Sequence, residues 1–375
     1  MSLRGQWVAK YSGSNAGTGV VDIDEFDDHF AGTAVAWDDN PALPNSLVRF
    51  RTLSKSTVQH LTTLPVTHLD AAGNTLFTDS INRLKINNIV LPSTVDIDFH
   101  LNGSTLSIQW SSSIGTSGSA IATAVKTRGG LPSDLIPTRV QGWNGFKRRM
   151  NAVEQKRYIF RGQPNNQWRL RTSFHRTGRA DLERYETLDV PDLLRIFSAV
   201  TSHVFHPANP LDRAALLNLA QHHGYPTPML DWTWSPYVAA FFAFQHVKRN
   251  ETSRRKIRIF KLDCAAWNEL PRADKLFPFM PHLTVLNPLV FGNARAIPQQ
   301  SICTVSNIDD IETHIKNVEL ARGKKYLEVF DLPANDRDRV VQELALMGIT
   351  AGALFPGLDG ACESLKERNF GGYAT

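Results

Sequence analysis

Apolar and polar residues alternate along much of the first third of the chain, and this alternation constrains the fold more than any other feature. The clearest case is 95–101, Val-Asp-Ile-Asp-Phe-His-Leu, where every second residue is apolar, and 19–24 and 106–110 repeat the pattern. Because successive side chains of a strand point to opposite faces, a period of two predicts half-buried β-strands. Asn102-Gly103 separates two of these strands and suits a tight hairpin turn. We therefore expect an all-β sandwich or barrel over residues 1–128.

The rest of the chain has a different character. Residues 129–144 are rich in Gly and Pro and predict a linker. Residues 145–375 mix helical and strand patterns without regular alternation, which favours an α+β domain over a doubly wound sheet. The β-rich part contains no catalytic constellation, so we expect it to bind a ligand, sense a signal or dock a partner.

Composition excludes several classes of protein. The chain is 42% hydrophobic and 21% charged, and no run of 18 apolar residues predicts a membrane span. Its first residues lack the apolar segment of a signal peptide, and its three cysteines have neither zinc-site nor disulfide spacing. These features predict a cytoplasmic protein with free thiols and no metal site.

A basic run extends from Lys147 to Arg184, with eleven Lys or Arg residues and three acids. Such a run can attract phosphates or an anionic polymer. A solvated charged surface is the simpler explanation of such a run, and the net charge of the whole chain is only +5.

Within that run, Tyr158-Ile-Phe-Arg-Gly-Gln163 predicts a buried strand that ends on a guanidinium. An unpaired buried arginine is costly, so Arg161 either pairs with a core carboxylate or faces a ligand. Its planar fork of donors suits a pyrophosphate. Gly162 would let a ligand approach the backbone, and Gln163 could reach a ribose or a carboxamide.

A second dense stretch runs from Gln221 to Thr233, after a helix predicted over 211–222. Asp231 or Thr233 could cap a buried helix that begins near Pro236. The stretch would then form a strand-to-helix corner, a common place for functional residues. Asp231 could also pair with Arg161.

Several of these motifs together resemble the FRG domain, a family named after its Phe-Arg-Gly motif. The resemblance extends over roughly residues 145 to 375 and is carried by Phe160-Arg-Gly-Gln163, 221–233, Ala240-Phe-Phe-Ala243, 295–300 and Leu354-Phe-Pro-Gly-Leu-Asp-Gly360. The sequence departs from the family pattern at Pro228-Met229, where a basic residue and Leu are usual. It departs again at Ser301, where Gly usually follows paired glutamines.

The order of motifs is also similar, more distantly, to the ADP-ribosyltransferase fold. This likeness implies that Arg161 holds NAD, that Thr233 with Ser235 braces the site, and that Gln300 occupies the position of the catalytic glutamate. An amide does not titrate, so Gln300 could orient a ribose but could not act as a base. Catalysis would then need electrostatic stabilisation by another acid.

The predicted site therefore has two groups of residues. The catalytic candidates are Arg161, Thr233, Gln300 and Asp231. The candidates for contacts to NAD are Arg161, Gly162, Gln163, His222, Tyr225, Ser235 and Phe242. His222 could equally be a hydrogen-bonded core histidine, and Phe242 could belong to the core.

Two functions from different classes follow. The first is an NAD-dependent effector that transfers ADP-ribose to a protein or nucleic acid, in a toxin or antiviral setting. The second is a non-catalytic module that recognises a nucleotide, sugar or nucleic-acid phosphate. In a third possibility, the motif residues only brace the core.

Overall fold

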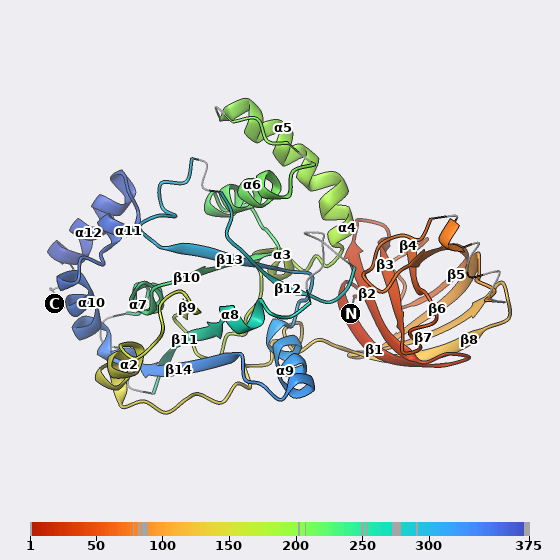
Figure 1. The fold of residues 1–375 in the computed structure, drawn as a ribbon, viewed down its shortest axis with the longest axis horizontal. Coiled ribbons are helices and arrows are strands. Elements are labelled where there is room, and N and C mark those ends of the chain that lie inside the picture. The colour runs from red at the N-terminus through yellow and green to blue at the C-terminus, as the bar shows by residue number, and fades with distance from the viewer. Residues whose placement is uncertain are drawn as a thin grey trace.

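The computed structural model describes residues 2–77, 79–81, 84, 89–201, 203–206, 208–248, 251–252, 254–271, 279–289 and 292–370. It contains a β-barrel followed by a mixed region of helices and sheet, which makes the chain α+β (Figure 1). None of the described helices is long and apolar enough to cross a membrane.

The first part is a closed barrel of eight antiparallel strands in sequence order, in which β1 pairs with β8. Its strands are β1 (Gly5–Gly13), β2 (Gly17–Glu25), β3 (Phe30–Asp38), β4 (Asn45–Arg51), β5 (Val58–Leu69), β6 (Thr94–Asn102), β7 (Thr105–Ser112) and β8 (Ser117–Ala124). The predicted hairpin is confirmed, because Asn102 pairs with Thr105 and Gly103 has a φ of 61°. Alternation along β6 puts Val95, Ile97, Phe99 and Leu101 inside the barrel.

The second part is built on a six-stranded sheet with the order β12-β13-β10-β9-β11-β14 and antiparallel pairing throughout. Its strands are β9 (Tyr158–Gln163), β10 (Met229–Thr233), β11 (Lys256–Asp263), β12 (Leu283–Leu286), β13 (Ser301–Ser306) and β14 (Leu327–Pro333). Its helices are α2 (Gly142–Met150), α3 (Ser173–Arg176), α4 (Leu182–Arg184), η1 (Tyr185–Asp189), α5 (Val190–Val200), α6 (Pro210–His222), α7 (Pro236–Phe244), α8 (Cys264–Trp267), α9 (Ile311–Arg322), η2 (Ala334–Asp336), α10 (Arg337–Leu346), α11 (Ala351–Leu354) and α12 (Leu358–Phe370).

Both faces of this sheet are covered. Helices α2, α7, α10 and α11 pack on one face around Phe160 and Phe330, and α6 covers Met229 and Cys303 of the same face. Helices α8 and α9 cover the other face around Ile159 and Phe260. Each core strand is therefore apolar on both sides, which explains why periodicity alone identified these strands less clearly than those of the barrel.

The barrel and the mixed region share a polar contact. Asp24 of β2 is 1% exposed and accepts hydrogen bonds from Arg179 Nε (3.1 Å), Arg184 Nη1 (2.9 Å) and Ala180 N (2.9 Å). On the neighbouring strand β1, Gln6 donates a hydrogen bond to Asn307 O and accepts one from Asp309 N. The two parts are thus joined by buried hydrogen bonds as well as by the connecting segment.

Some predicted elements have different bounds. The sequence also predicts a helix over 142–155. Helix α2 begins at Gly142 but ends at Met150, and Asn151 N donates a hydrogen bond to Lys147 O at its end. The apolar residues of 286–291 predict a strand, and these bounds are wrong, since β12 spans Leu283–Leu286. The last two residues of the predicted strand, Val290 and Phe291, lie outside the described residues.

Candidate functional site

The sheet opens between β9 and β10. Strand β9 pairs with β11 over its whole length and β10 pairs with β13 over five residues, but β9 and β10 share only the pair Phe160 and Thr233. Beyond Phe160 the strands diverge. Arg161 spans the opening, and its Nη1 donates a hydrogen bond of 2.6 Å to the backbone carbonyl of Asp231.

The guanidinium of Arg161 is buried. Its Nε has no exposed surface and no hydrogen-bond partner among the described residues, although the residue as a whole keeps some exposure. Burial lowers the pKa of Arg161 below its ordinary value, the charge of Asp231 opposes this, and Arg176 adds to it. Arg161 is therefore bound by a carbonyl and not by a bidentate carboxylate, so its charge is only partly compensated.

Asp231 supplies the negative charge at this opening. Its Oδ1 is buried without a hydrogen-bond partner among the described residues. Burial raises the pKa of Cys303, and the charge of the same carboxylate raises it further. The carboxylate also counteracts the lowering of the pKa of His222 by burial. Asp231 caps no helix: Ser235 is the N-cap of α7, which begins at Pro236 as predicted.

His222, at the end of α6, faces the same carboxylate. Its Nε2 is buried and unpartnered within the described part of the chain, whereas the neighbouring His223 is exposed. Burial lowers the pKa of His222, and the charge of Arg295 lowers it further. Only one of the adjacent histidines is thus turned inward.

We name this group the Arg161–Asp231 cluster: Arg161, Arg176, His222, Asp231 and Arg295. Its members come from β9, α3, α6, β10 and the segment before β13. It places the guanidiniums of Arg161 and Arg176 and the ring of His222 near one carboxylate, with the guanidinium of Arg295 near His222. Such an arrangement favours an anionic ligand that also carries hydrogen-bond donors.

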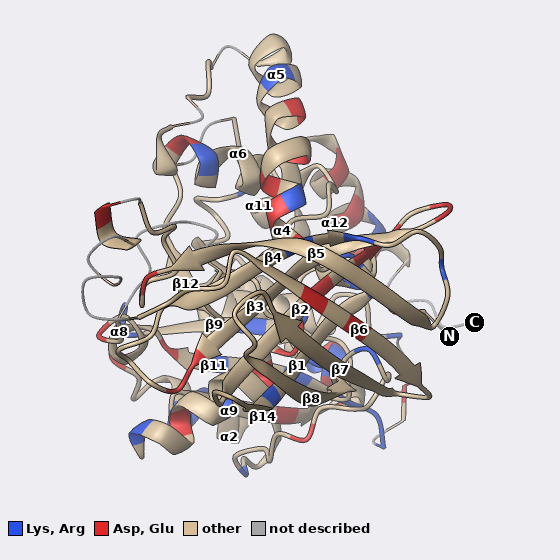
Figure 2. Cartoon of the chain, turned by 90° about the vertical axis from the view of Figure 1, so that its right-hand side faces the viewer, with Lys and Arg blue, Asp and Glu red and all other residues tan. Residues whose placement is uncertain are grey.

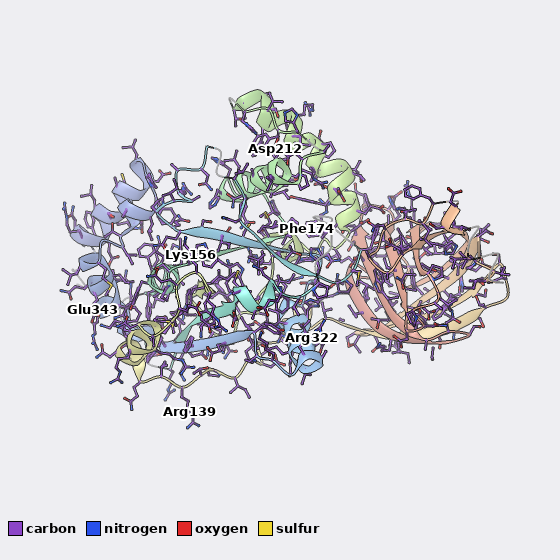
Figure 3. The ribbon with its side chains drawn as sticks, in the orientation of Figure 1. Arg139, Lys156, Phe174, Asp212, Arg322 and Glu343 are labelled. Carbon is purple, nitrogen blue, oxygen red and sulfur yellow. The ribbon has the colours of Figure 1, made fainter. Side chains whose placement is uncertain are left out.

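Two members were not predicted. Arg176 was part of the basic run, and Arg295 belonged to a motif stretch without being singled out. Ion pairing in the structure separates Arg176 from most of the other basic residues. Seven of the eleven basic residues between 147 and 184 pair with acids, namely Lys147, Arg149, Arg157, Arg169, Arg171, Arg179 and Arg184. One of these acids, Glu343, lies on α10, at the end of the molecule opposite the barrel (Figure 3).

The strand-to-helix corner is held by its own hydroxyls. Thr233 Oγ1 accepts a hydrogen bond from Ser235 N (3.0 Å), and Ser235 Oγ accepts one from Val238 N (3.2 Å). Thr233 is 4% exposed. These two candidates therefore shape the turn beside Asp231.

Gly162 and Gln163 continue β9 past Arg161. A Cβ at Gly162 would lie 1.9 Å from Ala239 O, so helix α7, and not a ligand, occupies the space next to this glycine. Gln163 is 7% exposed, and its Oε1 has no hydrogen-bond partner among the described residues.

Gln300 lies just before β13, and its carbonyl accepts a hydrogen bond from Trp234 N (3.1 Å). Its side chain is exposed and its backbone adopts a φ of 48°. The left-handed residue of this turn is therefore Gln300, while Ser301 opens the strand opposite Thr233. Gln299 points inward and donates from Nε2 to Leu354 O (3.0 Å), which brings two of the motif stretches together.

Tyr225 and Phe242 make contacts elsewhere. The hydroxyl of Tyr225 donates to Asp189 Oδ1 (2.9 Å), beside Tyr185. Phe242 packs edge-on against Phe355 with ring centroids 5.9 Å apart. Both side chains serve the packing of helices. Among the described residues, no three His, Cys, Asp or Glu side chains gather in a way that could hold a metal ion.

Comparisons with known proteins agree with part of this description. A search of the curated proteins found no match. A solved structure described as a redesigned beta barrel is 8% identical, with a TM-score of 0.22, over 32% of this chain and 90% of its own length. The FRG domain model matches residues 156–252, a span that holds Arg161, Arg176, His222 and Asp231 but not Arg295 or Gln300. The chain therefore carries an FRG domain in its mixed α+β region, which follows the eight-stranded barrel in the sequence.

Proposed function

We propose that the FRG region binds NAD at the Arg161–Asp231 cluster and breaks the bond between its nicotinamide and ribose. One observation carries the proposal. Arg161 Nε, Asp231 Oδ1 and His222 Nε2 are all buried, and none has a hydrogen-bond partner among the described residues. Buried polar atoms are nearly always satisfied, so three such atoms in one cluster point to a polar ligand.

The charges of the cluster match the two parts of NAD. The pyrophosphate is an anion, and Arg161, with Arg176 and Arg295 nearby, offers planar groups of donors to its oxygens. The nicotinamide ribose becomes positively charged as the ring leaves. Asp231 is the acid beside Arg161 that could stabilise this charge.

Besides NAD, the reaction needs only a molecule that accepts the ADP-ribose. The bond from ribose C1′ to the nicotinamide nitrogen breaks, and its electron pair leaves with neutral nicotinamide. The oxocarbenium-like carbon then bonds to an oxygen of a protein, a nucleic acid or water, and that oxygen loses its proton. Gln300 could hold the ribose but cannot take up the proton, because an amide does not titrate. A role in toxicity or antiviral defence would belong to the transfer reaction.

A second function is favoured by Gln300. Its exposed amide stands where the likeness to ADP-ribosyltransferases implies a glutamate. A cluster without that acid could bind a nucleotide or nucleic-acid phosphate and do no chemistry. Binding would then weaken with salt, since it would rest mainly on the arginines.

Two measurements separate these functions. Calorimetry with NAD and ADP-ribose reports binding, and chromatography reports released nicotinamide. We expect Arg161→Lys to weaken binding of both compounds about tenfold or more, because lysine cannot offer a fork of donors. We expect Asp231→Asn to bind ADP-ribose within a few-fold of the parent while nicotinamide release falls about a hundredfold.

Exposed residues provide the controls. Arg148→Lys and Asp27→Asn change the same side-chain types at exposed positions and should alter neither measurement. Binding of ADP-ribose without any nicotinamide release by the parent protein would favour the binding module. If neither NAD nor ADP-ribose binds, the NAD proposal is removed, and if a single-stranded oligonucleotide also fails to bind at low salt, the binding module is removed as well.

A further inference from the structure

The barrel is filled at one end and hollow at the other. Large side chains pack the filled end, where Phe50 and Phe99 meet with ring centroids 5.3 Å apart and Trp7 is 1% exposed. At the hollow end there is a cavity of about 440 Å³, and residues of all eight strands, β1 to β8, line it. This volume is in the range of small-molecule sites, and eight-stranded barrels are wide enough to hold one small ligand.

The hollow is a consequence of small residues at inward positions. Gly19, Ala34, Ala36 and Ala120 line the cavity from β2, β3 and β8, where larger side chains would fill it. Several inward apolar side chains, Ala34, Ala36, Val66, Ile108 and Trp110, are only partly buried. The interior therefore presents apolar surface that is still accessible.

Two aromatic rings form one wall. Tyr11 and Trp110 meet edge to face at 5.4 Å, and both line the cavity. Tyr11 lies against Gly17 and Trp110 against Gly118, because a Cβ at these glycines would be 2.7 Å and 2.2 Å from the two rings. The glycines thus allow both rings to lie close to the neighbouring strand. Strands β7 and β8 of this wall carry no charged residue (Figure 2).

His68 adds a polar group to the apolar lining. It is 8% exposed, and its Nε2 lies 3.0 Å from Pro92 O. A carbonyl only accepts, so Nε2 carries the proton, and Nδ1, which is buried without a partner among the described residues, is left as an acceptor. Burial lowers the pKa of His68, which keeps the ring neutral at neutral pH.

The lining also carries a negative charge. Asp38, at the end of β3, lines the cavity and accepts a hydrogen bond from Asn15 Nδ2 (2.9 Å). Burial and the charge of Asp38 both raise the pKa of Tyr11. A carboxylate beside an apolar cavity disfavours anionic ligands, fatty acids included.

We propose that the barrel is a binding domain for an uncharged, mainly apolar small molecule that carries a hydroxyl or amide N–H group. The apolar body lies among Ala34, Ala36 and Trp110. Its donor bonds to Nδ1 of His68. This site is separate from the Arg161–Asp231 cluster and does not depend on the function proposed for it.

Three naphthalenes of similar shape test the proposal on the full chain by titration calorimetry: 2-naphthol, 2-methylnaphthalene and 2-naphthoate. We expect one equivalent of 2-naphthol to bind, 2-methylnaphthalene to bind about three- to tenfold more weakly because it lacks the donor, and 2-naphthoate to bind most weakly of the three. Absence of 2-naphthol binding up to its solubility limit, or tighter binding of the naphthoate, would overturn the proposal.

Variants then locate the site. Ala36→Phe fills the hollow and should weaken 2-naphthol binding at least tenfold, with Ala34→Leu as a smaller change if the first variant does not fold. His68→Leu should weaken 2-naphthol but leave 2-methylnaphthalene within about twofold. Ile121→Phe and His100→Leu, both at exposed outward positions, are the matched controls. Equal loss of both compounds in His68→Leu, or unchanged binding in both cavity-filling variants, would contradict the assignment.

Discussion

The Nη1 atom of Arg161 lies 2.6 Å from the backbone carbonyl oxygen of Asp231, at the point where β9 and β10 diverge beyond their single pair, Phe160 and Thr233. The contact joins two motif stretches that are 70 residues apart. Oδ1 of Asp231 and Nε of Arg161 are buried and have no hydrogen-bond partner among the described residues. Arg161 therefore links the two diverging strands and places a positive charge between them.

Arg161→Ala should lower the free energy of unfolding by about 1–3 kcal/mol, because a buried carbonyl loses its donor. Urea denaturation followed by circular dichroism measures this change, with the exposed Arg148→Ala as the control. A loss of less than about 0.5 kcal/mol would show that the contact does not support the sheet.

Gly162→Ala should be strongly destabilising, by more than about 3 kcal/mol, because its Cβ would lie 1.9 Å from Ala239 O of α7. The added Cβ is attached directly to the backbone of β9, and Ala239 O belongs to the backbone of α7. Neither atom can move away unless the packed strand or helix shifts. The matched control is Gly129→Ala, whose Cβ would meet its nearest atom at 3.7 Å. Thermal unfolding of the two variants gives the comparison, and similar melting temperatures would refute the explanation given for this glycine.

Asp24→Ala should cost about 2–3 kcal/mol, because Arg179 and Arg184 would lose a shared buried carboxylate. We expect a smaller loss of stability than for a fully buried ion pair, because the side chains of Arg179 and Arg184 remain 26% and 31% exposed and water can still solvate them. Asp24→Asn keeps an acceptor and should cost less. Urea unfolding of both variants, against the exposed Asp27→Ala, checks the order; the prediction fails if Asp24→Ala and Asp27→Ala unfold alike.

Acid should destabilise the protein through buried histidines. Burial lowers the pKa of His175 from 6.5 to about 4. As pH falls through this window the unfolded state takes up the proton first, so stability that is present above pH 6.5 is lost by pH 4, by roughly 3 kcal/mol. Burial raises the pKa of Asp181 to about 6, and this group has the opposite sign, because its folded form takes up the proton first.

The contribution of His175 can be isolated by substitution. Urea unfolding at several pH values should give a shallower loss of stability between pH 6.5 and 4 for His175→Gln than for the parent. The exposed His223→Gln should keep the slope of the parent. Equal slopes for parent and His175→Gln would mean that this histidine is not buried as a neutral ring.

Much of the fold was predictable because it depends on local pattern. Alternation along 95–101 predicted a strand of the barrel, and the cap at Gly224, with a φ of 85°, ended the predicted helix at the right place. Capping at α7 was predicted in position but assigned to the wrong residue. Asp231, Thr233 and Ser235 are all acceptors, and only backbone geometry selects Ser235.

The composition of the candidate site could be predicted only in part. Arg161, His222 and Asp231 lie in motif stretches and meet in space. Arg176 was hidden among basic residues, most of which differ from it in pairing with acids once the chain is folded. Tyr225 and Phe242 share motif stretches with the site but turn toward other helices, and local sequence does not decide that direction.

The amino-acid sequence by itself determined the two-part organisation, most strands and helices, and the presence of an FRG motif, because these depend on residue type and spacing over a few positions. The tertiary structure decided that β9 and β10 separate at Arg161, that α7 lies against Gly162, and that the barrel closes around a hollow at one end. Each of these results from contacts between residues far apart in the chain, and such contacts are set by how strands pair and helices pack.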